Sequence, residues 1–440
     1  MRLAVILLAL VTASSAARVA YAQPVEPQPS DQVPPPTAPP PTEPPSEAPP
    51  LEKPSQQTPE EKAPEKEKTE EVKPEGGFFP GGGFVLRSSD ESFKLRLRLQ
   101  SAIRASVSIN GKAQLANPFM TLRPVLEGNL YKKWIRFWTS LELAANPVYL
   151  LDSYVEIEPV PEFGIRAGQQ WTIFSRHEAI YGPGQLLMPE WSPVADYFWP
   201  GRDKGITIYG ATAKGKFDYA AGAYVGSPLR SFEPIRGNYQ FMARLGVSPN
   251  GPVGSEYAYA EPGNPDDVRF AIGVNAVTSK VDQGAENFNP STFKFEVTPT
   301  GETKLYNMLG ADVLIQSPVV MFSAEGYVRR TNPHGGLADY TSVGGFAQAG
   351  VLVYKHDVDL VTRFDWIDVN TDAAHDGAFA IEGGANYYIS APWVIFRLRY
   401  AYGSQRTPTE GVDATSSGGA PLILAPGHVH VITAQINTTF

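Results

Sequence analysis

The sequence of 440 residues contains no cysteine, and it has few long hydrophobic runs. The missing cysteines exclude a disulfide framework and a thiolate metal site. Hydrophobic residues make up 42% of the chain, the mean hydropathy is −0.21, and the only long apolar run lies at the N-terminus. A bundle of membrane-spanning helices is therefore excluded. The formal net charge of −9 argues against nucleic acid as a partner.

The sequence also lacks the common catalytic motifs. No G-x-S-x-G, H-E-x-x-H or glycine-rich phosphate loop occurs. The six histidines do not form a cluster, and only His428 and His430 share the face of one expected strand. Two ligands without a third make a poor metal site. We therefore expect no enzyme activity, no metal and no cofactor.

Residues 1–22 have the features of a secretory signal peptide. Arg2 precedes an apolar run from Leu3 to Val11, and Ala20-Tyr21-Ala22 forms a small-x-small cleavage site. We expect cleavage before Gln23, because the apolar run is too short to remain as a membrane-spanning helix.

Residues 23–82 form a predicted disordered linker in the periplasm. The segment is rich in proline, then in glutamate and lysine, and it ends in the glycine-rich stretch 76–83, which we interpret as a hinge. It holds too few apolar residues to offset the entropy of ordering, and its prolines keep it extended. Contact of residues 23–75 with the cell wall is an open alternative.

Residues 83–440 show the alternation of a β-barrel. In FKLRLRLQSAIRASVSIN, at 93–110, apolar residues fall on one parity and basic or polar residues on the other. Such a ribbon has one apolar and one polar face, and it is long enough to cross a bilayer. Sixteen strands are predicted, at 93–110, 119–128, 134–144, 150–159, 164–172, 205–213, 216–225, 239–248, 268–278, 305–316, 318–330, 341–353, 357–367, 377–387, 393–403 and 429–440.

The predicted connections alternate in length, as in an outer-membrane barrel with short periplasmic turns and long external loops. The longest are 173–204, 279–304 and 404–428, whereas most connections after even-numbered strands are tight, with 249–267 as an exception. The last strand ends in Phe440, and a terminal aromatic residue on an alternating strand resembles the signal read by the outer-membrane assembly machinery.

Strand parity predicts which charged side chains point inward. The basic set is Lys94, Arg96, Arg98, Arg104, Arg136, Arg166, Arg244, Arg269, Arg363, Arg397 and Arg399, and the acidic set is Glu142, Asp152, Glu156, Asp312, Glu325, Asp359 and Asp365. Closure should bring the last strands beside the first. We expect Arg397 and Arg399 to lie level with Lys94, Arg96 and Arg98, as a basic group facing the lumen without an acid of the same parity on those strand segments. The alternative is that these charges neutralise one another in a crowded interior.

Several stretches resemble the phosphate-selective porin O and P family. They are GFVLRSSDESFKLRLRLQ at 83–100, LRPVLEGNLYKKW at 122–134, LDSYVEIEPVPEFGIRAGQQWTIFSR at 151–176, VADYFWPGRDKGI at 194–206 and FDYAAGAYVG at 217–226. The resemblance implies a sixteen-stranded, commonly homotrimeric channel whose third external loop, here 173–204, folds into the lumen as a constriction. The residues of this loop that we single out are Arg176, Tyr181, Trp191, Trp199, Arg202 and Lys204.

The sequence therefore predicts an all-β protein: a sixteen-stranded antiparallel transmembrane β-barrel with an inward-folded third external loop, preceded by a disordered proline-rich arm. The predicted function is a diffusion channel for small hydrophilic solutes, favouring anions such as phosphate, in the outer membrane of a Gram-negative bacterium. Its expected partners are membrane lipid, small anions and the assembly machinery. Two alternatives stay open: a barrel serving as an adhesin or cell-wall tether, and a secreted soluble β-sandwich that binds carbohydrate.

Overall fold

The structure is a computed structural model. It describes residues 74–79, 82–110, 112–145, 148–178, 186–226, 237–253, 267–282, 285–289, 294–298, 303–333, 338–354, 357–374, 376–390, 393–405 and 427–440. These residues belong to one compact unit, Val72–Phe440. The predicted signal peptide and the predicted linker up to residue 73 lie outside the described residues.

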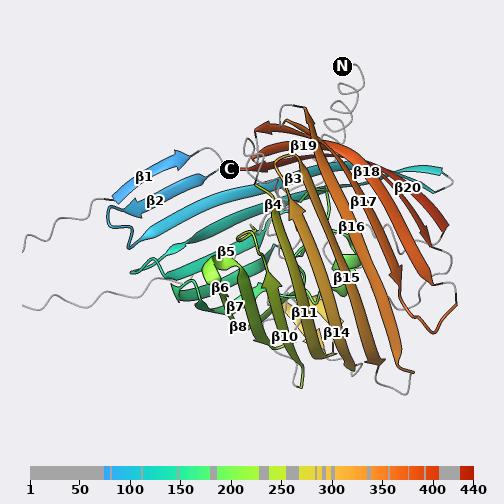
Figure 1. Cartoon of the computed structure of the whole chain (residues 1–440), viewed down its shortest axis with the longest axis horizontal. Coiled ribbons are helices and arrows are strands. Elements are labelled where there is room, and N and C mark those ends of the chain that lie inside the picture. The colour runs from blue at the N-terminus through green and yellow to red at the C-terminus, as the bar shows by residue number, and fades with distance from the viewer. Residues whose placement is uncertain are drawn as a thin grey trace, which may run out of the picture. The chain divides into compact units, whose positions relative to one another are not determined.

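Sixteen antiparallel strands close into a barrel, because the last strand pairs with the first strand of the ring (Figure 1). They are β3 (Lys94–Asn110), β4 (Lys112–Asn129), β5 (Ile135–Glu142), β6 (Tyr149–Val160), β7 (Phe163–Trp171), β8 (Arg202–Thr212), β9 (Phe217–Tyr224), β10 (Tyr239–Val247), β11 (Arg269–Asp282), β14 (Thr303–Gln316), β15 (Val320–Pro333), β16 (Tyr340–Tyr354), β17 (Val358–Asp368), β18 (Gly377–Ser390), β19 (Val394–Gln405) and β20 (Gly427–Thr439). All sixteen predicted strands are confirmed, and a soluble sandwich is excluded. A two-stranded sheet, β12 (Ala285–Asn289) with β13 (Lys294–Thr298), lies in the connection after β11.

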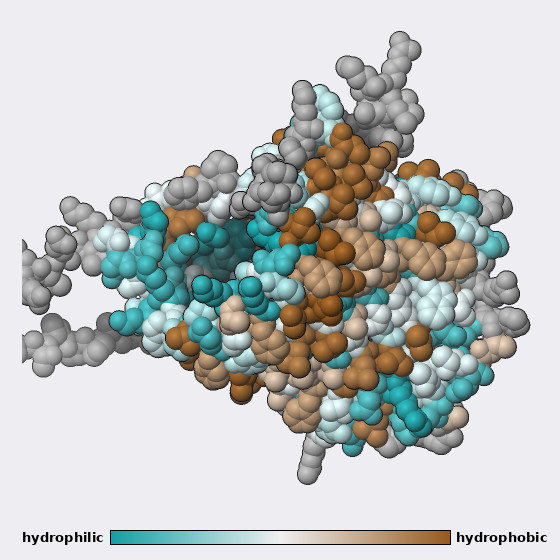
Figure 2. All heavy atoms as spheres, viewed as in Figure 1, coloured by the Kyte–Doolittle hydropathy of each residue, from teal (hydrophilic) through white to brown (hydrophobic). Residues whose placement is uncertain are grey.

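The barrel has its polar residues inside and its apolar residues outside. In β17, Asp359, Arg363 and Asp365 are buried, whereas Leu360 and Phe364 between them are exposed. The same alternation places exposed leucine, isoleucine, valine and aromatic residues along the outer face of the other strands. Figure 2 shows these hydrophobic residues gathered in a band over the strands from β14 to β19, with a hydrophilic hollow on the side where β3–β7 lie. This inversion of a soluble core is the arrangement that lipid requires.

Two segments differ from the predicted pattern at the start of the barrel. First, residues 111–118, expected as a loop, are mostly strand, because only one residue separates the end of β3 at Asn110 from the start of β4 at Lys112. Second, part of the predicted linker and hinge is ordered: β1 (Pro74–Phe79) and β2 (Gly83–Ser88) form a hairpin, and β2 pairs with β3 from Phe84↔Leu97 to Arg87↔Lys94. The prediction missed this hairpin because its glycines interrupt the alternation of apolar and polar residues, and because β2 also depends on pairing with β3.

The connections confirm two unequal ends. Short turns join β4 to β5, β6 to β7, β8 to β9 through the 3₁₀ turn η2 (Ala213–Gly215), β14 to β15, β16 to β17 and β18 to β19. The opposite end carries most of the long connections, although one residue joins β3 to β4 there and the connection from β10 to β11 at the short-turn end spans 248–268. The third connection of the opposite end, between β7 and β8, folds into the barrel. Its described residues include the short helix α2 (Pro193–Phe198), the one helix of the α type among the residues that the structure describes. No helix in the described ranges is long and apolar enough to cross a membrane.

Candidate functional site

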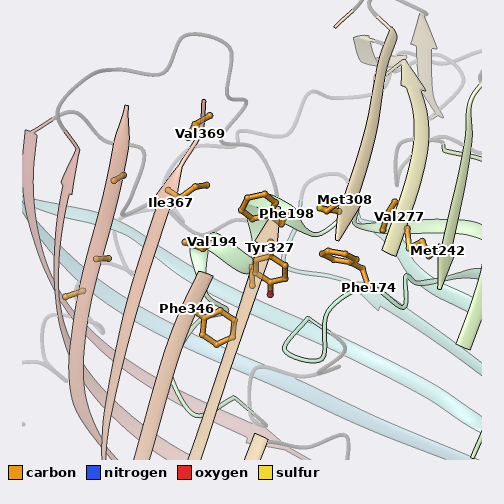
Figure 3. Packing of buried hydrophobic residues seen from close by; sticks show 14 of the residues in the cluster. Phe174, Val194, Phe198, Met242, Val277, Met308, Tyr327, Phe346, Ile367 and Val369 are labelled. Atoms are coloured by element: carbon orange, nitrogen blue, oxygen red, sulfur yellow. The ribbon is translucent and has the colours of Figure 1, made fainter. Parts of the chain in front are cut away.

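The inward loop lies against one wall of the barrel through apolar contacts. Phe174, Val194 and Phe198 from the loop are buried with Tyr327 of β15 and Phe346 of β16 (Figure 3). The Phe198 and Tyr327 rings stack with their centroids 5.1 Å apart. Burial of such side chains is worth about 1.5–3 kcal/mol each, so these contacts hold this part of the loop on the β15–β17 wall.

A second set of contacts is ionic and spans the closure of the barrel. Glu190 in the loop forms ion pairs with Arg104 of β3 and Arg399 of β19. Gln435 of β20 donates to the carbonyl of Pro189, 3.1 Å away. The loop therefore bonds to the first strand and to the last two strands of the ring at the place where they meet.

Two further arginines hold the backbone of the same loop segment. Arg397 donates to the carbonyl oxygen of Leu186 at 2.5 Å, and Arg363 donates to that of Glu190 at 2.8 Å. Arg363 also pairs with Glu382 and Asp365. Both arginines are 1% exposed. Their guanidinium groups are structural anchors, held by several hydrogen bonds each.

The expected height of the basic group at the closure is therefore wrong. Arg397 and Arg399 are level with Gln435 and Thr433, and β20 in turn places Gln435 opposite Arg104 of β3. They do not lie level with Lys94, Arg96 and Arg98, because β20 ends before it reaches them. Strand stagger in a tilted barrel displaces the two ends of the sheet by several residues, and parity alone does not contain that offset.

The basic residues also have acidic partners, as the alternative of mutual neutralisation predicted. Arg399 pairs with Glu382 of β18 as well as with Glu190, and both Arg96 and Arg98 pair with Glu127 of β4. The acids belong to neighbouring strands and to the loop, which parity on the arginines' own strands could not reveal.

The residues singled out in the third loop contact different parts of the barrel wall. Arg176 pairs with Asp312 of β14 at 2.6 Å. Trp191 and Trp199 both pack on Trp171 at the end of β7, with ring centroids 6.2 and 4.8 Å apart. These tryptophans thus pack the loop against the wall. Tyr181 lies outside the described residues.

Arg202 and Lys204 do not belong to the loop, because β8 begins at Arg202. Arg202 is buried, stacks on the Trp171 ring at 3.5 Å and pairs with Asp152. Lys204 has intermediate exposure. Both residues belong to β8 and not to the loop that the resemblance implied as the constriction.

The wall formed by β3–β7 carries the more accessible inward charges. Its ion pairs join Arg96 and Arg98 to Glu127, Arg123 to Glu142, Arg136 to Glu156 and Glu158, and Arg166 to Glu156. These are five arginines and four glutamates. Arg136 is the most accessible of them, with 43% of its side chain exposed, in contrast to the buried arginines of the opposite wall. Lys94 has intermediate exposure at the start of β3.

A buried polar cluster lies under the loop on the opposite wall. Glu325 of β15 accepts hydrogen bonds from the Ser175 hydroxyl at 2.7 Å and from the His177 amide at 2.6 Å. Burial and the nearby Arg363 lower the pKa of His177, so its ring is neutral and accepts a hydrogen bond from the Ser192 amide. Burial, together with Asp196 and Glu325, raises the pKa of Glu178. Sequence reasoning missed Glu178 and Glu190, because alternation carries no information about a loop.

The described ranges contain no group of three or more histidine or acidic side chains placed to hold a metal ion. The inward arginines instead offer charge-assisted hydrogen bonds and guanidinium faces, which are the means by which proteins bind anions.

No protein-family model matches the sequence, and comparison with curated protein sequences finds no significant match. Solved structures do match. An anion-selective porin from Comamonas acidovorans is 12% identical with a TM-score of 0.54, covering 79% of this chain and 99% of that one. In-vitro folded OmpT, an outer membrane protein of Vibrio cholerae, is 10% identical with a TM-score of 0.53, covering 79% and 98%.

The chain has the fold of an outer-membrane porin. Salmonella typhi OmpF, solved with daunomycin, adds a third match at 11% identity and a TM-score of 0.50, covering 80% of this chain and 99% of that one. At these identities the likeness concerns the fold alone. Membership of the phosphate-selective O and P family stays a prediction.

Proposed function

We propose that this protein is a diffusion channel for small hydrophilic solutes in the outer membrane of a Gram-negative bacterium. The observation that carries the proposal is the inverted barrel, with apolar residues outside and polar and charged residues inside. A lipid-facing outer surface and a polar lumen suit a water-filled pore. Porin-fold neighbours support the same function and location, and one of them is titled a trimer form, which supports a homotrimer.

The channel favours anions through the β3–β7 wall. Five arginines face four glutamates there, and the most accessible of these arginines is Arg136. The arginines of the closure are bound to the loop and to acids, so they do not set selectivity. An ion that is transported must also leave, and partly neutralised guanidinium groups form several weak sites instead of one tight site. Phosphate is one anion that such groups bind bidentately.

The test is the reversal potential of the purified protein in a planar bilayer under a KCl gradient. Arg96→Gln combined with Arg136→Gln should shift the reversal potential towards cations. Arg330→Gln serves as the control: it removes one arginine charge but should leave the reversal potential unchanged, because Arg330 forms an exposed pair with Asp339 and lies on β15, outside the β3–β7 wall. Heat-modifiable migration on a gel confirms that each variant is folded.

Two outcomes would contradict the proposal. Folded protein that gives no conductance would favour the tether or adhesin alternative. Folded channels whose reversal potential is unchanged by the substitutions of Arg96 and Arg136 would show that the β3–β7 wall does not set selectivity.

A further inference from the structure

Two guanidinium groups on the β3–β7 wall lie over aromatic rings. The Arg98 guanidinium is 5.3 Å from the centroid of the Trp138 ring on β5. The Arg166 guanidinium is 4.7 Å from the Tyr154 ring on β6 and 5.4 Å from the Tyr209 ring on β8. Attraction between a cation and a ring face stabilises this geometry.

Two of these aromatic rings are neighbours on this wall, and the third lies against the backbone of β7. Trp138 and Tyr154 are directly paired across β5 and β6, and their ring planes differ by 2° at a centroid separation of 6.4 Å. Tyr209 lies over Gly164, where an added Cβ would come within 2.7 Å of the ring. The glycine therefore leaves room for a ring to lie against the backbone, close to the wall of the lumen.

The guanidinium groups are fixed and still accessible. Glu127 and Glu156 bind the edges of Arg98 and Arg166, at 2.6 Å in each case. Each arginine nevertheless keeps 16% of its side chain exposed. A guanidinium bound at its edge and stacked on a ring has limited freedom, so a ligand that meets it loses little further entropy.

Arg136 adds the charge contact beside these stacked groups. It lies opposite Glu156 on β6, and its Nη2 is 3.4 Å from the Tyr209 hydroxyl. With 43% of its side chain exposed, it can turn towards a carboxylate in the lumen. Inorganic anions need only this charge, whereas the flat guanidinium faces of Arg98 and Arg166 complement a second flat, delocalised group.

We propose that the β3–β7 wall is a binding track for planar organic anions, specifically aromatic carboxylates. The carboxylate pairs with Arg136, and the aromatic ring stacks on the guanidinium face of Arg166 or of Arg98. The inference rests on the proposed channel function and names its substrate class. A saturated carboxylate has the same charge but no flat face to stack, so the track discriminates between the two.

The experiment compares block of the channel current by benzoate and by cyclohexanecarboxylate, which have equal charge and similar size. In wild-type channels in KCl, the benzoate concentration that halves the conductance should be about threefold lower than the cyclohexanecarboxylate concentration that does so. Arg166→Lys keeps the charge and removes the planar face. This variant should keep the reversal potential and bring the two blocking concentrations to within about 1.5-fold of each other. Arg330→Lys, at an exposed pair with Asp339, is the matched control and should behave as wild type.

Equilibrium dialysis of labelled benzoate against the detergent-solubilised full chain tests the track without conduction. Benzoate binding that cyclohexanecarboxylate displaces poorly, and that Arg166→Lys weakens, supports the track even in a protein that does not conduct. Equal block and equal binding by the two carboxylates in anion-selective channels would overturn the track and leave the proposed function intact. Absence of conductance would overturn the proposed function instead, and dialysis would then decide about the track.

Discussion

Glu190 in the inward loop accepts a hydrogen bond from Arg399 on β19 across 3.2 Å. The same carboxylate pairs with Arg104 on β3, so one loop residue joins two strands that lie on either side of β20. The barrel is closed by β20 pairing with β3. The loop therefore reinforces this closure from inside, in addition to narrowing the lumen.

Replacement of Glu190 by glutamine should loosen the loop and weaken the closure. The amide keeps one acceptor but removes the charge that faces Arg104 and Arg399, and a hydrogen bond to a charged group is worth about 1.5–3 kcal/mol. We expect the free energy of unfolding in urea to fall by about that amount. In single-channel records, the current through this variant should fluctuate more than the current through the wild-type channel, because the loosened loop moves in the lumen. Glu91→Gln, at an exposed turn before β3, is the control; equal loss in both variants would contradict the loop's role.

The sequence predicted the strands well, because alternation is a local property that each strand carries by itself. Asp359, Arg363 and Asp365, for example, are inward residues as parity demands. The sequence-based prediction failed for features that depend on contacts with strands distant in the sequence. The partners of Arg399 come from β18 and from the loop, and its height follows from the register of β20 against β3. Loop residues such as Glu190 do not follow the alternation of a strand, so the sequence pattern could not predict their contacts.

The hairpin of β1 and β2 distinguishes the effects of two N-terminal deletions. Removal of residues 23–73 should leave channel conductance and heat stability unchanged, because these residues lack the apolar side chains of a core. Removal of residues 23–88 also deletes β2, which pairs with β3 from Arg87↔Lys94 to Phe84↔Leu97. We expect this longer deletion to lower the temperature at which the folded gel band disappears. If the folded gel bands of the two deletion variants disappear at the same temperature, the hairpin does not stabilise β3.

Deletion of Phe440 should impair assembly in the outer membrane. Its backbone amide donates to the carbonyl of Leu99 at 2.9 Å, and the Leu99 amide donates to the Phe440 carbonyl at 3.0 Å. The deletion removes this pair of hydrogen bonds at the closing seam along with the terminal aromatic ring. The measurement is the fraction of heat-modifiable protein in isolated outer membranes. Phe440→Tyr keeps both features and should assemble normally; a wild-type yield from the deletion would refute the prediction.

We expect Glu178 to make the stability of the loop dependent on pH. Its side chain is buried, and one carboxylate oxygen has no hydrogen-bond partner among the described residues. Burial, with Asp196 and Glu325 nearby, raises its pKa well above the ordinary 4.5, although Arg202 and Arg363 act in the opposite direction. The folded protein therefore holds this proton more tightly than the unfolded chain does.

Because the folded pKa is raised, the contribution of Glu178 to stability is complete below pH 4.5 and declines as the pH rises towards the folded pKa. Glu178→Gln cannot ionise, so it should match wild type in acid and be more stable than wild type at alkaline pH. The measurement is the loss of the folded gel band with temperature between acid and alkaline pH, with Glu162→Gln at an exposed turn as control. A constant difference between the Glu178 variant and wild type across this range would mean that Glu178 does not titrate in the folded loop.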